Sequence, residues 1–163
     1  MSRKRSELFE KMIDKINESY DLMSEYDSLP HNYGGEEYLY QSESQIIHVV
    51  GEHPGITARE LSDLIRKTPS FCSQNIRKLK KKDCIAQIRN EQNAREYFLE
   101  LTEKGRGIYR DHKKFEDACL MRTLENLQAF SDEDIGKFIE MQEKINASFR
   151  EDVAESKKNG RKW

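Results

Sequence analysis

The feature that most constrains this chain is the stretch from residue 57 to residue 82, where two short helix patterns are separated by a turn. The first begins with Thr57 and Glu60, a spacing at which each side chain caps a backbone amide near the other. The second begins with Thr68 and Pro69, a capping residue followed by a proline at the first helical position, where a missing N–H costs little. Two short helices joined by a turn predict a helix-turn-helix.

Both helices of this unit have an apolar side at helical spacing. In the first helix it consists of Leu61, Leu64 and Ile65. In the second, a projection at about 100° per residue gives a narrow stripe of Cys72, Ile76 and Leu79. We expect the second stripe to pack onto the first helix.

The opposite face of the second helix is polar and cationic. It carries Ser70, Gln74, Arg77 and Lys81, with Ser73 and Lys78 on its flanks and the capping Thr68 at the start of the helix. An amide can pair with an adenine edge, and cations bind guanine edges or phosphates. A merely solvated helix more often carries interleaved acids, yet no acid lies between Asp63 and Asp83. We therefore expect this helix to enter the major groove of double-stranded DNA.

Charge is distributed unevenly along the chain. Residues 66–89 contain eight Lys and Arg residues against one acid, Asp83, which gives a local charge of +7. The net charge of the whole chain is −2, so the remaining residues carry −9. A basic patch on an acidic body is typical of a protein that binds nucleic acid with one face.

A β-hairpin is predicted directly after the second helix. Residues 85–89 and 97–101 are short, β-leaning runs that flank a polar turn. A hairpin in this position is a wing, whose tip can lie along the DNA backbone or in the minor groove. We expect Arg89 and Arg95 to contact DNA there.

Further helices are predicted on both sides of this unit. They cover residues 7–28, a short segment with a capping box at Ser42 and Gln45, residues 102 to about 130, and a last helix that begins at Ser131. Their apolar stripes exceed what a small winged domain can bury, so we expect a homodimer. The second helix of the helix-turn-helix, the recognition helix, would then be present twice. The two copies would lie about 34–36 Å apart, or a multiple of that, and match a palindromic site.

The expected fold class is mainly α with a small β-hairpin wing (α+β), a winged helix-turn-helix with N- and C-terminal dimerisation helices. The expected segments are an N-terminal helix and loop of the dimerisation lobe (1–41), a DNA-binding lobe (42–101), C-terminal helices of the dimerisation lobe (102–150) and a frayed tail (151–163).

Several other classes of protein find little support. Three cysteines without paired spacing argue against a disulfide scaffold or structural zinc, and favour the reducing cytosol. The N-terminal region lacks the apolar core of a signal peptide, and no apolar run approaches the length of a membrane span. We therefore expect a cytoplasmic protein. No phosphate-binding loop, nucleophile elbow or metal-hydrolase motif is present, so we expect that the protein is not an enzyme and needs no cofactor.

Effector binding is left open by the sequence. Tyr20, Tyr33, Tyr38, Tyr40 and His48 could line an aromatic pocket for a small molecule, although packing explains tyrosines equally well. His112 and Glu116 have a helical spacing that a metal site can use, and Cys119 is the cysteine with the least defined role. Cys72 and Cys84 are expected to be structural. A metal or redox sensor of the same fold is therefore an alternative, as is a winged-helix protein-interaction module that binds no DNA.

Three stretches carry a recognisable pattern, namely SESQIIHVVGEHPGITARELSDLI, SQNIRKLKKKDCI and LELTEKGRGIY. Through them the chain resembles, over nearly its whole length, the MarR family of winged-helix transcription regulators. The resemblance implies a homodimeric regulator, which we expect to act as a repressor, with an effector at the junction of its lobes. Two features depart from the family pattern. Asn93-Ala94-Arg95 replaces an Asp-x-Arg motif in the wing, and Asp83 replaces a glycine before it.

Overall fold

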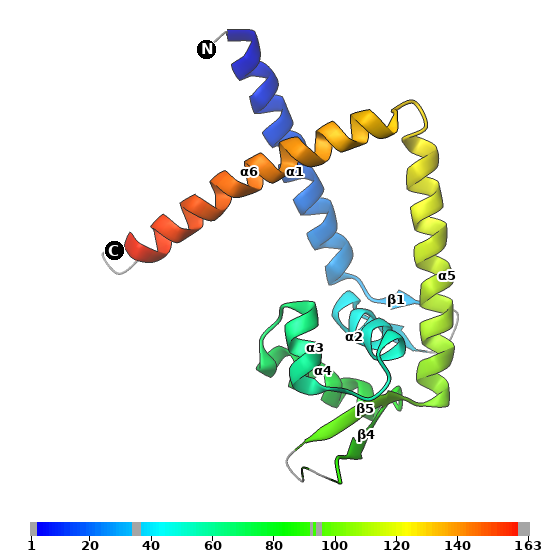
Figure 1. Cartoon of the computed structure of the whole chain (residues 1–163). Helices are drawn as coiled ribbons and strands as arrows, with labels where there is room; N and C mark the ends of the chain where they lie inside the picture. The colour runs from blue at the N-terminus through cyan, green and yellow to red at the C-terminus, as the bar shows by residue number, and fades with distance from the viewer. Residues whose placement is uncertain (1–2, 34–36, 92, 94–95, 160–163) are drawn as a thin grey trace. The chain divides into compact units, whose positions relative to one another are not determined.

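The computed structural model describes residues 3–33, 37–91, 93 and 96–159. Figure 1 shows the chain coloured from its N-terminus to its C-terminus, with most of its elements labelled. In chain order the elements are α1 (Arg3–Ser28), β1 (His31–Asn32), β2 (Tyr38–Leu39), α2 (Gln41–Glu52), β3 (Ile56–Thr57), α3 (Ala58–Ile65), α4 (Pro69–Lys81), β4 (Ile85–Arg89), β5 (Tyr97–Leu101), α5 (Glu103–Asn126) and α6 (Asp132–Asn159). The chain is mostly helical with two small antiparallel sheets, so the expected fold class is confirmed.

The chain divides into two compact units, Met1–Asp117 and Ala118–Trp163, and the boundary falls inside α5. The first unit contains the helix-turn-helix, the hairpin and α1. The sequence suggested instead that the N-terminal helix and the C-terminal helices form one dimerisation lobe. That division into lobes stays a prediction.

The hairpin predicted after the second helix is present. Strands β4 and β5 pair antiparallel, with Ile85 opposite Leu101 and Arg89 opposite Tyr97. Strand β3 pairs with the other edge of β5, so the sheet order is β3-β5-β4. This sheet ties the hairpin, which follows α4, back to the start of the helix-turn-helix, because β3 leads directly into α3.

The predicted helix caps are formed as the sequence indicates. The Thr57 backbone N–H donates to Glu60 Oε2 at 2.9 Å, and the Glu60 N–H donates to Thr57 Oγ1 at 3.2 Å. The N–H of Phe71 donates to Thr68 Oγ1 at 3.2 Å. Ser131 likewise caps α6. These local bonds satisfy amides that a helix leaves without partners, and so they fix where the helices begin.

The start of α2 differs from the prediction. The helix begins at Gln41 with Tyr40 as its N-cap, so the box at Ser42 and Gln45 is wrong. The carboxylate that accepts the Tyr40 N–H, at 3.0 Å, belongs to Glu43. Glu43 is almost completely buried. It also forms an ion pair with a residue far away in the sequence, described below, and this contact favours the cap at Tyr40 and Glu43 over the predicted one at Ser42 and Gln45.

Two further predictions are corrected. Leu64 does not join the inward face of α3, since 55% of it is exposed and Ser62 is buried instead. The segment predicted to be frayed is helical as far as Asn159. Its composition explains this, because strong helix formers continue through the segment and Lys157 and Lys158 lie in the last turn, where cations interact favourably with the helix dipole.

Asp83 adopts the left-handed backbone conformation that its position before the wing requires, with φ of 56°. A non-glycine residue tolerates this conformation best when it is Asp or Asn. Close by, Gly105 leaves no room for a side chain, because a Cβ there would lie 2.0 Å from the carbonyl oxygen of Cys84. The turn into β4 and the first turn of α5 therefore touch backbone to backbone.

The core of the first unit lies among α2, α3, α4 and the three-stranded sheet. Its largest fully buried apolar side chains are Leu39, Ile46, Ile47, Leu61, Leu79 and Leu99. Helix α1 has no buried residue and exposes Leu8, Phe9, Tyr20, Leu22, Met23 and Tyr26.

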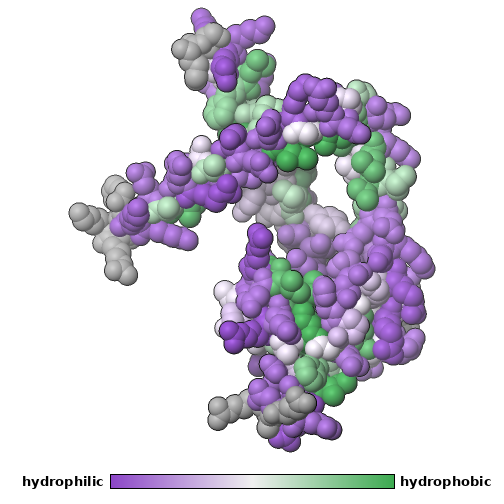
Figure 2. Space-filling view, viewed as in Figure 1, coloured by the Kyte–Doolittle hydropathy of each residue, from purple (hydrophilic) through white to green (hydrophobic). Residues whose placement is uncertain are grey.

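The second unit also exposes apolar side chains, and Figure 2 shows such residues, in green, open to solvent on its helices. They include Leu120, Met121, Leu124, Phe138, Ile139, Met141, Phe149 and Val153. None of the described helices is long and apolar enough to cross a membrane.

Candidate nucleic-acid interface

Helix α4 packs with the face that the sequence predicts. Cys72, Ile76 and Leu79 are buried. Asn75, which the apolar pattern missed, is buried beside them; its Nδ2 donates to the Phe71 carbonyl oxygen at 3.0 Å, and its Oδ1 lies 3.4 Å from Ser42 Oγ. The only sign of this role in the sequence was the position of Asn75, a polar residue next to the apolar stripe. The Asn75 side chain anchors α4 to α2.

The opposite face of α4 is open to solvent. All the side chains predicted to face DNA from this helix are exposed, namely Ser70, Ser73, Gln74, Arg77, Lys78 and Lys81, and so is its capping residue Thr68. Because the inward stripe is fixed by burial, these residues share one accessible surface. We call this surface the α4 face.

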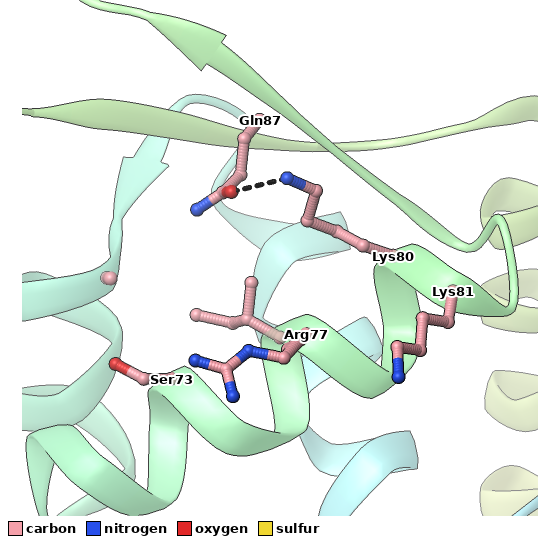
Figure 3. Close-up of a pocket in the computed structure, with 7 residues that line it drawn as sticks. Ser73, Arg77, Lys80, Lys81 and Gln87 are labelled. Atoms are coloured by element: carbon pink, nitrogen blue, oxygen red, sulfur yellow. Dashed lines mark hydrogen bonds between the residues drawn. The ribbon is translucent and has the colours of Figure 1, made fainter.

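The α4 face borders a hollow between α4 and the sheet. It is lined by Ala58, Ser73, Ile76, Arg77, Lys80, Lys81 and Gln87. Figure 3 shows Lys80 extending from α4 toward Gln87 of β4, and the two are joined by a hydrogen bond of 2.7 Å from Nζ to Oε1. In the same view Arg77 extends along the helix toward Ser73. Lys80 was counted in the basic patch but was not predicted as a site residue.

The wing contains Arg89, one of the two arginines expected to contact DNA. Arg89 is exposed at the end of β4, opposite Tyr97. The other wing arginine, Arg95, lies outside the described residues. At the base of the tip the Asn90 Nδ2 donates to Glu96 Oε2 at 3.0 Å.

An ion pair holds the C-terminal end of α4. Lys82 Nζ lies 2.9 Å from Glu43 Oε2 of α2, and it also donates to the Tyr38 carbonyl oxygen at 2.9 Å. The Lys82 side chain is 27% exposed and that of Glu43 only 1%. Helix α2 thus holds α4 at two points, through Asn75 and through Lys82.

A second group of polar side chains lies between α2 and α5. His48 Nδ1 and His112 Nδ1 lie 3.4 Å and 3.5 Å from Glu116 Oε2. Both nitrogens are buried, and neither has a hydrogen-bond partner among the residues that the structure describes. Burial lowers the pKa of His112 below its ordinary value, although Glu116 acts in the opposite direction. Among the residues that the structure describes, only here do three potential metal-binding side chains lie within 4.8 Å of one another.

The residues proposed to line an aromatic pocket are only partly brought together. Tyr33 is buried, and its ring makes an edge contact with that of His112 at 4.7 Å, while the rings of His48 and His112 lie 6.0 Å apart. Tyr20, Tyr38 and Tyr40 are exposed side chains rather than parts of this group.

The cysteines occupy different environments. Cys72 and Cys84 are buried, and burial raises the pKa of both thiols. Cys119 is half-buried in α5. A raised pKa disfavours the reactive thiolate, so the environments of Cys72 and Cys84 fit the structural role expected for them.

The three-helix core, the exposed α4 face and the hairpin beside it define a winged helix-turn-helix protein. A family model described as the MarR family matches residues 40–96, which run from the N-cap of α2 into the wing. Over these residues the chain is therefore similar to the MarR family, and the resemblance seen in the sequence is confirmed there. A comparison with curated proteins finds no match.

Solved structures support the fold. The chain is similar to the zinc-responsive MarR family member ZitR of Lactococcus lactis, with a TM-score of 0.73 and 15% identity over 87% of this chain and 99% of that one. It is also similar to FabT of Streptococcus pneumoniae in complex with DNA, with a TM-score of 0.67 and 25% identity over 89% and 99% of the two chains. ZitR in complex with DNA gives a TM-score of 0.71 at 17% identity, over 85% and 96%.

Proposed function

We propose that this protein is a sequence-specific, DNA-binding transcription regulator that acts as a repressor. The observation that carries the proposal is the α4 face, an exposed set of hydroxyl, amide and cationic side chains without an acid. The opposite side of α4 is held by α2 through Asn75 and Lys82. Two of the similar structures, FabT and ZitR, are complexes with DNA, which supports the same use of this fold.

The side chains of the α4 face divide by their chemistry. Gln74 can bond the edge of an adenine, and Ser70 and Ser73 are short enough to contact base edges without holding the helix away from the groove. Arg77, Lys78 and Lys81 supply cations for phosphates, and Arg77 can alternatively read a guanine. Arg89 would contact the backbone from the wing. Phosphate contacts supply affinity and base contacts supply specificity.

The proposed assembly is a homodimer on a palindromic operator. Helix α1 exposes a series of large apolar side chains, and the second unit exposes another. Exposed apolar surface of this extent usually marks an interface. A two-fold dimer would cover it and present two α4 faces to successive turns of DNA.

Responsiveness to an effector is the finer part of the proposal. An effector can change DNA affinity only if it binds two states of the protein unequally. The contacts between α2 and α4 make α2 the element through which such a change would reach the α4 face. ZitR is described as zinc-responsive, which keeps an ion among the candidate effectors.

The experiment that tests the proposal is a DNA-binding assay. Purified protein is titrated against its own upstream region, with random DNA as competitor, from about 50 to 200 mM salt, a range over which phosphate-driven binding falls steeply. Binding that survives excess competitor supports the regulator. Weak binding that is lost equally for both DNAs, or no binding by dimeric protein, overturns it in favour of a winged-helix protein-interaction module.

A further inference from the structure

We propose that His48, His112 and Glu116 form a binding site for a divalent transition-metal ion of the zinc class, between α2 and α5. Binding of the ion to these residues is independent of DNA. Its regulatory consequence rests on the proposed function.

The geometry of the three donors fits such an ion. Zinc binds imidazole nitrogen and carboxylate oxygen at about 2.0–2.2 Å, and two ligands of a tetrahedral site are then about 3.3–3.5 Å apart. The Nδ1 atoms of His48 and His112 lie 3.4 Å and 3.5 Å from Glu116 Oε2. No pair of donors is separated by more than 4.8 Å, so small side-chain rotations can bring all three to one centre.

The environment of the two histidines also points to a ligand. Nδ1 of His48 and Nδ1 of His112 are both buried and make no hydrogen bond within the described part of the chain. Only 3% of the His112 side chain is exposed, so a nitrogen left without a partner there costs free energy. Packing against Tyr33 accounts for the position of the His112 ring but not for two unsatisfied nitrogens that face one carboxylate. A shared ion would satisfy both.

The donor set selects the class of ion. Two imidazoles and one carboxylate suit zinc, cobalt and nickel, whereas magnesium and calcium prefer oxygen ligands. The side chains of His48 and Glu116 are 33% and 46% exposed, which leaves an open side for entry of the ion and for water as a further ligand. Three protein ligands and an open position favour reversible binding over a closed structural site.

The position of the site suggests how the ion would act on DNA binding. Coordination would tie His112 and Glu116 of α5 to His48 of α2. The N-terminal turn of α2 contacts α4 through Ser42 and Glu43. An ion that fixes α2 against α5 therefore acts on the helix that supports the α4 face.

Ion binding is tested with untagged protein and Co²⁺, whose visible absorption reports coordination by protein ligands. We expect one Co²⁺ per chain, displaced by Zn²⁺. Glu116→Gln and His48→Gln should each lower the affinity by about 100-fold or more, because loss of even an outer-shell partner costs 10–100-fold. Asp117→Asn and His53→Gln remove comparable exposed groups outside the site and should change nothing. Absence of Co²⁺ binding, or equal binding by Glu116→Gln and the control variants, overturns the site.

The regulatory consequence is tested by DNA titrations with Zn²⁺ or with a chelator. We expect the affinity of the native protein to change by about fivefold or more between the two conditions, as is typical of coupled sites. The affinity of Glu116→Gln should not change. If the protein binds Co²⁺ but no DNA under either condition, the proposed function fails and the metal site stands. If DNA affinity is the same with and without Zn²⁺, the regulatory role is overturned.

Discussion

Lys82 and Glu43 form an ion pair that joins the residue after α4 to the first turn of α2, with Nζ and Oε2 2.9 Å apart. The same carboxylate accepts the backbone N–H of Tyr40 at 3.0 Å. A single buried side chain thus fixes both the start of α2 and the end of the helix that carries the proposed DNA contacts. This double use explains why a glutamate can be almost completely buried here.

Replacing Lys82 by Met should destabilise the protein. The substitution keeps most of the side-chain volume but leaves the buried Glu43 carboxylate without its cation, a change that typically costs about 3–5 kcal/mol. Because Lys82 is partly exposed, we expect a value near 3 kcal/mol, the low end of this range. Urea unfolding at a fixed protein concentration measures it. Lys80→Met is the matched control, with an expected change within about 0.5 kcal/mol; equal losses in the two variants would contradict the role given to Lys82.

Two glycines of α5 should respond to alanine in opposite directions. At Gly105 a Cβ would meet the Cys84 carbonyl oxygen at 2.0 Å, so the turn before the wing would have to move, and we expect a loss of about 3 kcal/mol or more. At Gly107 the added Cβ meets no atom of the described residues within 4 Å, apart from its chain neighbours and the backbone of its own helix. There the higher helix propensity of alanine should stabilise the protein by roughly 0.5–1 kcal/mol. Thermal unfolding of the two variants distinguishes them, and two shifts of the same sign would refute the close approach.

Much of this fold could be predicted because its signals are local. Three helix starts are marked by nearby residues, namely Thr57 with Glu60, Thr68 with Pro69, and the capping Ser131. The inward stripe of α4 follows from helical periodicity, and its burial is confirmed at Cys72 and Leu79. The predicted end of α6 is wrong because two local signals disagree there. The high charge of the segment was taken to favour fraying, whereas its residues individually favour helix.

The features that sequence could not supply depend on residues far apart in the chain. Glu43 and Lys82 are separated by 39 residues, and nothing local marks them as a pair. His112 and Glu116 are marked by their helical spacing, but the third donor, His48, comes from α2 and is identified only when α2 packs against α5. Leu64 has the spacing of an inward residue, and its exposure is a property of the tertiary packing.

Replacing Lys81 by Ala should weaken DNA binding without changing sequence preference. If Lys81 neutralises a phosphate, the variant loses affinity for operator and random DNA alike. The slope of log K against log salt should then become shallower by about 1 for each phosphate that the protein no longer neutralises. Titrations at several salt concentrations measure the slope. Lys137→Ala in α6 also removes an exposed cation and should leave the slope unchanged; a similar fall in that variant would show that net charge, rather than the α4 face, is responsible.

Replacing Gln74 by Ala should instead reduce specificity. Loss of an amide that pairs with a base edge costs about 1–3 kcal/mol at one position of each half-site, and binding to random DNA should stay the same. Competition between the operator and a set of single-base variants locates the position. Equal loss of affinity on operator and random DNA would contradict a base-reading role for Gln74.

Replacing Met23 by Glu should dissociate the proposed homodimer. Met23 is 60% exposed in α1, so the substitution has little to disrupt within one protomer. In a dimer that covers this helix the carboxylate would be removed from water, and we expect the dissociation constant to rise at least about tenfold, equivalent to 1.4 kcal/mol. Sedimentation equilibrium measures the constant. Leu64→Glu places the same charge on a similarly exposed apolar residue of α3, which the proposed dimer leaves uncovered, and should have no effect. Unchanged association of Met23→Glu, or equal weakening by both substitutions, would mean that α1 does not form the interface.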